Sequence, residues 1–505
     1  MYKFFEAHPG SELGQFLFDS RQELTRLVLT NPDKAIKTLC EKYFFGSRSD
    51  FWDDHIFNSV LAPALYTLTS QELGPAINLF SHLDHALFFH YVRRDEDPVR
   101  FRRAFWNLNQ FGLKLAQRFK EETRFNDADF SLDPVATSLS KKRIAFVFKG
   151  PFRLAHSEFL REFLVGCRTF SNLVDVYLVL LDYPVELVKA ADLDHIKIFS
   201  LAGHKDTYSK LKSYAQLIQS LNPDHVSWVA CVQNISLYMG VRYAKVQSYW
   251  SMKYHSIIMD SLDKYAGLGF GGSCFQYDDV NWFRGRAFPD LSLPKLNTTQ
   301  IADLRKSINV SSSDILLGCF VRAEKLNNID YWKLIERILA SDSRLHFVIA
   351  SQSLPSVADE FLASNLFKQQ FHSLGWVDTK QWCQCLDIYL DSFPRGSCLT
   401  ALEAIKAQKP VVLFDTEHNR ESSALPYLAS VAKDGAPQGI LPVTDVESIH
   451  KAILPLLTHE NHRKQLSDVQ GLLLSSLEGG RSLFAKDYLN YFLDSSFTLD
   501  QALVK

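Results

Sequence analysis

The stretch from Leu386 to Asp415 limits the possible folds more than any other, because it is typical of a strand, a turn, a helix and a second strand. Ile388–Leu390 is a short apolar run, and Phe393–Ser397 combines the proline, glycine and serine that mark a turn. From Leu399 to Ala407 the apolar residues recur every three residues, as in a helix packed on a sheet. Val411–Phe414 has the composition of a buried strand. This alternation predicts a parallel sheet covered by helices.

The turn before this helix also predicts a ligand site. Small and hydroxyl residues that lead into a helix N-terminus leave main-chain N–H groups without helical partners, at the positive end of the helix dipole. A phosphate group suits such a place. Taken alone, the stretch is equally compatible with an ordinary strand–helix–strand unit that binds nothing.

Length and composition indicate a globular protein of several domains. The chain has 505 residues, of which 46% are hydrophobic and 22% charged. At roughly 150 residues per domain, this length predicts three domains. The net charge is −2 and no block of lysine or arginine occurs, so neither nucleic acid nor an anionic membrane is the expected partner.

The cysteines and the N-terminus bear on the compartment. Eight cysteines are scattered along the chain, and only Cys383 and Cys385 are close together, with no second pair at zinc spacing. We therefore expect buried free thiols, a reducing compartment and no metal site. The N-terminus lacks the apolar core of a signal peptide, and no window reaches the roughly 18 uncharged apolar residues of a membrane span. A cytoplasmic protein without a transmembrane segment is the expectation.

The pattern of apolar residues predicts four parts. Residues 1–130 show helical spacing, which predicts an all-α N-terminal domain that either holds an acceptor protein or supports its neighbour. Residues 141–300 and 310–480 each alternate strands with helices, which predicts two Rossmann-like domains facing a cleft. Residues 481–505 are predicted to be a helix that packs back onto the rest. This α/β arrangement is the GT-B architecture, shared mainly by glycosyltransferases and a few sugar-nucleotide epimerases.

Two polar clusters follow strands of the 141–300 block. His156 comes soon after the first strand and could perform acid–base chemistry, or simply cap a helix. Lys253 and His255 stand among aromatic residues after a later strand, where they are either functional or part of a packing cluster. We interpret Gly267–Gly272 as a flexible loop, because no clear strand precedes it.

Three segments of the 310–480 block carry a family resemblance. Gly318–Asn327, Leu374–Trp376 and Leu390–Pro410 resemble the donor-site segments of the O-GlcNAc transferase family. That family includes the bacterial cytoplasmic protein N-glucosyltransferases that modify adhesins. The similarity covers roughly residues 310–430 and is thin over 140–300.

The resemblance implies a site for UDP-sugar and assigns residues to it. Lys325, with Arg322 nearby, would meet the diphosphate, where a compact charge can neutralise departing UDP. The backbone of Leu374 and Trp376 would recognise uracil. Lys253 is a further candidate for this site.

The helix that begins at Leu399 supplies the remaining donor-site candidates. Ser397 and Thr400 would donate hydrogen bonds to phosphate, with Cys398 between them. Glu403 would accept both ribose hydroxyls; the alternative is a solvated helix glutamate. Arg420 would brace the phosphates or the sugar, unless it only forms a surface salt bridge.

Departures from the family pattern bear on the chemistry. Many retaining GT-B enzymes carry a glutamate eight residues before the position of Glu403, and here that residue is Arg395, which favours the inverting branch. Cys398 and Leu399 replace the family's histidine–threonine pair, so one donor to the phosphates is missing. Inverting transfer needs a base for the acceptor, for which His156 is the first choice and Lys253 and His255 the second.

The sequence thus predicts an inverting glycosyltransferase that is independent of metals and cofactors. It would move a hexose or N-acetylhexosamine, from UDP-glucose or UDP-GlcNAc, to a side chain of a protein such as an adhesin or flagellin. One alternative is a transferase that acts on a glycan or lipid-linked acceptor. Another is a non-catalytic GT-B subunit that chaperones a true transferase, and an epimerase would turn over UDP-GlcNAc without any acceptor.

Overall fold

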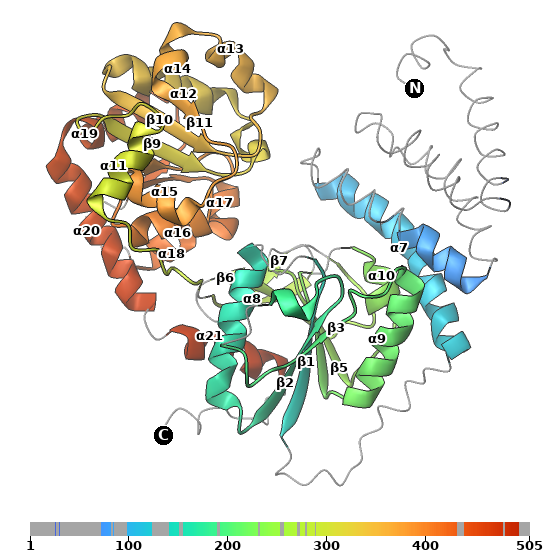
Figure 1. The fold of residues 1–505 in the computed structure, drawn as a ribbon. Helices are drawn as coiled ribbons and strands as arrows, with labels where there is room; N and C mark the ends of the chain where they lie inside the picture. The colour runs from blue at the N-terminus through green and yellow to red at the C-terminus, as the bar shows by residue number, and fades with distance from the viewer. Residues whose placement is uncertain are drawn as a thin grey trace. The chain divides into compact units, whose positions relative to one another are not determined.

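Figure 1 shows the fold of the chain in a computed structural model. It describes Arg26, Thr30 and residues 72–81, 84, 98–123, 141–150, 155–188, 192–230, 233–252, 257–269, 273–277, 280–287, 289–431, 439–477 and 480–493. The chain forms two compact units. Unit 1 comprises Met1–Leu268, Gly272–Gly285 and Ala485–Lys505, and unit 2 comprises Gly269–Gly271 and Arg286–Phe484.

Unit 1 is built on an eight-stranded sheet with the order β3-β2-β1-β4-β5-β6-β8-β7. Strands β1 to β6 pair in parallel, and β7 pairs with β8 in antiparallel fashion. The strands are β1 (Lys142–Phe148), β2 (Val174–Leu180), β3 (Lys197–Ser200), β4 (His225–Val229), β5 (Val246–Trp250), β6 (Lys264–Gly269), β7 (Ser273–Tyr277) and β8 (Val280–Arg286). The helices that connect them are α8 (Ala155–Gly166), η5 (Cys167–Phe170), η6 (Val185–Leu187), α9 (Thr207–Leu221) and α10 (Ile235–Met239).

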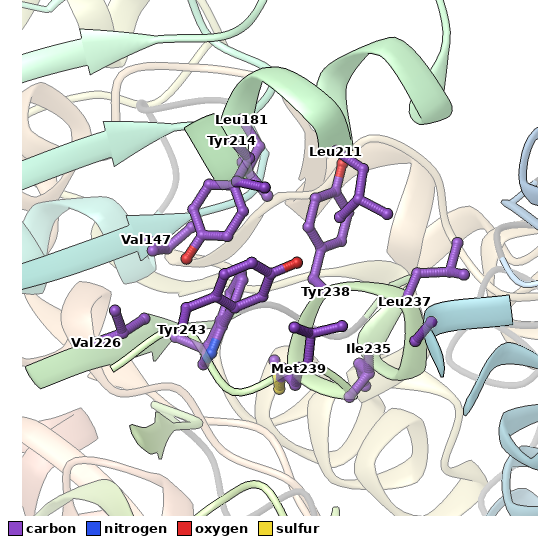
Figure 2. Packing of buried hydrophobic residues seen from close by; sticks show 14 of the residues in the cluster. Val147, Leu181, Leu211, Tyr214, Val226, Ile235, Leu237, Tyr238, Met239 and Tyr243 are labelled. Carbon is purple, nitrogen blue, oxygen red and sulfur yellow. The ribbon is translucent and has the colours of Figure 1, made fainter. Parts of the chain in front are cut away.

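Two N-terminal helices share the core of unit 1. The helix 73–81 and α7 (Pro98–Thr123) bury side chains in the same cluster as strands β1 and β4. Gly112 lets α7 approach α10 closely, because a Cβ at this position would collide with Ser236 and Phe80. Figure 2 shows part of this core. The rings of Tyr214 and Tyr243 meet there edge to face, with their centroids 4.9 Å apart. The predicted boundary near residue 130 stays a prediction.

Unit 2 is built on a six-stranded sheet with the order β11-β10-β9-β12-β13-β14, all parallel. The strands are β9 (Ile315–Phe320), β10 (Leu345–Ala350), β11 (Phe371–Ser373), β12 (Ile388–Leu390), β13 (Val411–Asp415) and β14 (Ile440–Pro442). The helices are α11 (Thr298–Lys306), η7 (Ala323–Leu326), α12 (Ile329–Ser341), η8 (Ser356–Ala358), α13 (Asp359–Leu362), α14 (Asn365–Gln370), α15 (Thr379–Cys385), α16 (Leu399–Lys406), α17 (Glu417–Ser422), α18 (Leu425–Val431), α19 (Val446–Thr458) and α20 (Glu460–Leu477).

Both faces of this second sheet are covered. Leu317 and Cys319 of β9 belong to one buried cluster, and Leu316 and Phe320 belong to another. Successive side chains of a strand point to opposite faces, so a strand buried on both faces needs a continuous apolar run. This is why the apolar runs of the sequence located most strands correctly.

The last described helix, α21 (Gly480–Phe492), belongs to unit 1 from Ala485 onward. The Tyr488 hydroxyl donates to the carbonyls of Gly267 and Gly285, at 2.5 and 3.2 Å. The Tyr488 ring stacks on Trp250 at 4.5 Å. His225 Nδ1 lies 2.9 Å from the Phe492 carbonyl. These contacts join α21 to β4, β5, β6 and β8.

The predicted fold class is confirmed, with two local corrections. Gly267–Gly269 belongs to strand β6 rather than to a flexible loop. The aromatic and cationic cluster that contains Lys253 and His255 was predicted to span residues 247–256 after a strand, but it begins inside one, since Gln247 and Trp250 are part of β5. Among the described helices, none is both long enough and apolar enough to cross a lipid bilayer.

Candidate functional site

The strand order of unit 2 alone indicates where a ligand would bind. From β9 the chain proceeds outward to β10 and β11, then returns to form β12 on the other side of β9. Loops leave in opposite directions where the order reverses, and doubly wound sheets bind ligands at the carboxyl ends of the strands there. The segments that leave this point are η7, which contains Lys325, and the turn Asp391–Cys398, which leads into α16. We call this segment the β12–α16 turn.

Two buried side chains bond the N–H groups of the β12–α16 turn. Both carboxyl oxygens of Asp391 accept from the main-chain N–H of Ser397, each at 2.9 Å. Asn419 Oδ1 accepts from Gly396 N at 2.6 Å, while Asn419 Nδ2 donates to the Phe414 carbonyl at 2.8 Å. Asp391 and Asn419 are fully buried. The N–H groups of Gly396 and Ser397 are therefore used within the protein.

The carbonyl groups of the turn are bonded as well. Lys325 Nζ donates to the Gly396 carbonyl. The other carbonyls take donors from neighbouring segments: Arg395 O from Ser392 Oγ at 2.8 Å, Pro394 O from Thr416 Oγ1 at 2.7 Å and Ser397 O from Ala424 N at 2.9 Å. From the Arg395 carbonyl to the Ser397 carbonyl, each main-chain N–H and C=O group has a partner inside unit 2.

At the start of α16, in contrast to the preceding residues, main-chain N–H groups lack hydrogen-bond partners among the described residues. Its first helical bond runs from Leu402 N to the Cys398 carbonyl at 3.1 Å. The N–H groups from Cys398 to Ala401 have no hydrogen-bond partner within the described part of the chain, and no side chain caps the helix. Such groups, with the helix dipole, form a place that favours an anion. Lys325 adds a positive charge beside it.

The hydroxyls predicted to donate to phosphate contact Tyr389. Ser397 Oγ and Thr400 Oγ1 both lie 2.9 Å from the Tyr389 hydroxyl, and Thr400 Oγ1 also donates to the Phe320 carbonyl at 3.0 Å. This network ties α16 to the ends of β9 and β12. The part of Ser397 and Thr400 in phosphate binding stays a prediction.

Opposite charges face each other at this point. Burial lowers the pKa of the Lys325 ammonium, and the nearby Asp391 carboxylate acts against that shift. Burial raises the pKa of Asp391 to about 6, while the Ser397 N–H group and Lys325 act in the opposite direction. Burial also raises the pKa of the Cys398 thiol to about 12, so Cys398 stays a neutral thiol at physiological pH.

Glu403 is buried rather than solvated, which excludes the interpretation of an ordinary surface glutamate. Its side chain is 2% exposed, and Oε2 accepts from Thr379 Oγ1 at 2.8 Å. Burial raises its pKa to about 7, with the Thr379 bond and the charge of Lys380 in the opposite direction. Glu403 therefore joins α16 to the first residue of α15.

The segment before α15 contains the two residues predicted to meet uracil. Leu374 donates its main-chain N–H to the Ile349 carbonyl at 2.9 Å, so this N–H is used by the neighbouring strand. Trp376 is 84% exposed, the largest exposure among the large hydrophobic residues described. Gly375 between them has a φ of +68°, a conformation that favours glycine.

The predicted arginines lie at the surface of the same edge. Arg420 on α17 bonds Asp415 with both Nε, at 2.6 Å, and Nη2, at 3.0 Å. Arg322 precedes η7 and is exposed. The structure thus brings Arg322, Lys325, Ser397 and Arg420 to the carboxyl edge of one sheet, as parallel strands require.

The candidates for a catalytic base remain predictions. His156 belongs to α8, but its side chain is not among those described, and Lys253 and His255 lie outside the described residues. In the part of the chain that the structure describes, no three His, Cys, Asp or Glu side chains gather to hold a metal ion. Cys383 and Cys385 are buried free thiols, as expected, whereas Cys274 is an exposed free thiol.

Unit 1 has a polar cluster at the corresponding edge of its own sheet. Lys149, just after β1, forms a 2.9 Å ion pair with Asp182, which also pairs with Lys210 on α9. Asp84 is fully buried and accepts from the Asn234 N–H at 2.5 Å. Burial raises the pKa of Asp84 to about 7.

Sequence reasoning missed Tyr389, Asp391, Thr379 and Asn419. The only sequence signal was an aspartate directly after a buried strand. Asn419 lies on α17, a short helix that the apolar pattern did not predict.

Comparisons with known proteins agree with this architecture. No protein-family model and no curated protein matched the chain. A glycosyltransferase from Rickettsia africae superposes with a TM-score of 0.50 at 12% identity, covering 70% of this chain and 98% of that one. An O-GlcNAc transferase mutant of Thermobaculum terrenum covers 94% of this chain and 95% of its own, at 17% identity and a TM-score of 0.47. Anabaena HepE in complex with UDP and glucose covers 70% and 100%, at 10% identity and a TM-score of 0.45.

Two doubly wound parallel sheets in one chain are the two halves of a GT-B fold. The likeness to the Rickettsia africae glycosyltransferase agrees with that class. At such low identity the likeness concerns the fold, and the chain resembles GT-B glycosyltransferases in this respect.

Proposed function

We propose that this chain is a glycosyltransferase that uses a UDP-sugar as donor. The observation that carries the proposal is the start of α16. The hydrogen-bonded segment from Arg395 to Ser397 leads there into N–H groups that have no partner among the described residues, and Lys325 lies beside them. These groups are suited to a diphosphate, the part of UDP that carries its negative charge.

The same groups account for the chemical step. In an inverting transfer the acceptor attacks the anomeric carbon while the bond to the β-phosphate oxygen breaks, and negative charge grows on departing UDP. Lys325 and the N–H groups of α16 would stabilise that charge most strongly in the transition state. Arg395, in place of a glutamate, supports single displacement. The reaction is proposed to need no metal ion, because the ammonium and the helix N-terminus perform the role of a divalent cation.

The acceptor is proposed to be a protein side chain in the cytoplasm. Sequence resemblance over residues 310–430 is what supports a protein acceptor, with His156 as the base that takes its proton. The sugar would be a hexose or an N-acetylhexosamine.

Intact-mass analysis of acceptor proteins after incubation with a panel of UDP-sugars tests the proposal. We expect a mass increase of one sugar that persists in the presence of a chelator. Lys325→Ala should weaken UDP binding by about 10- to 100-fold, because a hydrogen bond to a charged group contributes about 1.5–3 kcal/mol. Lys333→Ala, at an exposed lysine paired with Asp330, is the matched control and should bind UDP normally.

Each other outcome has a defined meaning. Absence of UDP binding at millimolar concentration contradicts the proposal as a whole. Binding with transfer only to a glycan or a lipid-linked acceptor contradicts the protein acceptor. Conversion of UDP-GlcNAc without acceptor identifies an epimerase, and transfer that Lys325→Ala leaves at full rate contradicts the proposed site.

A further inference from the structure

We propose that Asp391 and Asn419 are positioning residues that hold the β12–α16 turn in the conformation that binds the diphosphate. The inference rests on the proposed function, and it concerns two residues that act through the main chain rather than by touching the nucleotide. Four observations support it.

Asp391 determines where the N–H group of Ser397 points. It is the first residue after β12, and both of its oxygens accept from that single N–H group. Cys398, the next residue, precedes the first residue of α16. The peptide plane that Asp391 fixes therefore joins Gly396 to Ser397, just before the N-terminus of α16, and the direction of the N–H groups that follow depends on it.

Asn419 fixes the preceding peptide from the other side. Its amide accepts from Gly396 N and donates to the Phe414 carbonyl at the end of β13. An amide side chain can accept at one end and donate at the other, whereas an ionised carboxylate lacks the donor and leucine lacks both groups. Asn419 thus connects the turn to β13 and α17.

Gly396 lies between these two side chains, where no larger residue fits. A Cβ on Gly396 would collide with Asp391 Oδ2 and would come within 3.1–3.2 Å of the Asn419 amide. Gly396 is buried, and its short contact with each side chain leaves the turn little room to move.

The carbonyl of Gly396 accepts the hydrogen bond from Lys325. Asp391 and Asn419 therefore determine the position of the lysine as well as the direction of the helix N-terminus. Both groups that would bind the diphosphate are oriented through one peptide segment. Loss of either side chain should weaken contacts to the phosphates and leave contacts to the nucleoside unchanged.

The experiment compares UDP with uridine in titrations of the full-length chain. Asp391→Asn keeps the shape and one acceptor oxygen but removes the charge that faces Lys325. Asn419→Leu keeps the approximate volume and removes both hydrogen bonds. We expect each variant to bind UDP about tenfold more weakly, with uridine affinity within about twofold of the wild type, since net hydrogen-bond contributions are of this size.

The matched control is Asp387→Asn. Asp387 also accepts from a main-chain N–H, that of Leu316 at 2.8 Å, but it precedes β12 and lies at the opposite edge of the sheet. This variant should lower the melting temperature and leave the ratio of UDP to uridine affinity unchanged. If Asn419→Leu does not fold, the isosteric Asp391→Asn decides the question.

Several results would overturn the inference. Equal losses of UDP and uridine affinity would show a purely structural role, and wild-type UDP affinity in both variants would show no role. A changed affinity ratio in Asp387→Asn would show that the effect is not specific to the turn. Failure of the wild type to bind UDP is a different result, which contradicts the proposed function itself.

Discussion

Replacement of Glu403 by glutamine gives the most direct test of the electrostatics at the candidate site. Burial raises the pKa of Glu403 from 4.5 to about 7. The folded state thus binds a proton that the unfolded chain releases near pH 4.5. The stabilisation from Glu403 is complete below pH 4.5 and is lost as the pH rises toward 7 and above.

The magnitude follows from the size of the shift. A difference of about 2.5 units, at about 1.36 kcal/mol per unit, sets a limit of about 3 kcal/mol. Most of this, about 2.5 kcal/mol, should develop between pH 5 and pH 8. Glu403→Gln cannot ionise and keeps an oxygen that accepts from Thr379. Its stability relative to the wild type should therefore increase by about 2.5 kcal/mol over that range.

Urea unfolding followed by circular dichroism, at pH 5 and at pH 8, measures this difference. Asp391 and Asp84, whose pKa values burial raises to about 6 and 7, contribute to the pH dependence of both proteins and cancel in the comparison. Equal stability differences at the two pH values would refute the reasoning. The predicted ribose contact adds a second expectation: UDP should bind more tightly as the pH rises through 7 in the wild type, more so than in Glu403→Gln.

Three further substitutions test individual contacts. Tyr389→Phe removes the hydrogen-bond partner that the Ser397 and Thr400 hydroxyls share and should lower the free energy of unfolding by about 1–3 kcal/mol; an unchanged urea midpoint would contradict this network. Trp376 is 84% exposed, so a uracil ring bound beside it can quench its fluorescence. Trp376→Phe should therefore abolish any quenching of tryptophan fluorescence by UDP. Quenching retained in the variant would exclude the predicted contact with uracil. Arg420→Ala removes an exposed ion pair and should leave the melting temperature unchanged, yet slow transfer if Arg420 braces the phosphates or sugar; a wild-type turnover rate would remove Arg420 from the site.

The sequence by itself determined the alternation of strands and helices in unit 2. Ile388–Leu390 was predicted as a strand with the ends that the structure shows, and α16 differs from the predicted helix by one residue. These elements are encoded locally, because a parallel strand covered on both faces must be a continuous apolar run and a helix packed on it must repeat its apolar residues. Lys325, which the family resemblance assigned to the site, lies in η7 after β9.

Only the tertiary structure decided which polar groups are used inside the protein. Asn419 contacts a residue 23 positions away, and Tyr488 bonds to Gly267 across 221 positions. No local pattern records such contacts, since the partner of a buried polar group depends on which segments the fold brings together. For this reason Gly267–Gly269 was interpreted as a loop and the role of Asp391 was missed. The same reason explains why Ser397 and Thr400, which the sequence predicts to meet phosphate, bond to Tyr389 in the folded chain.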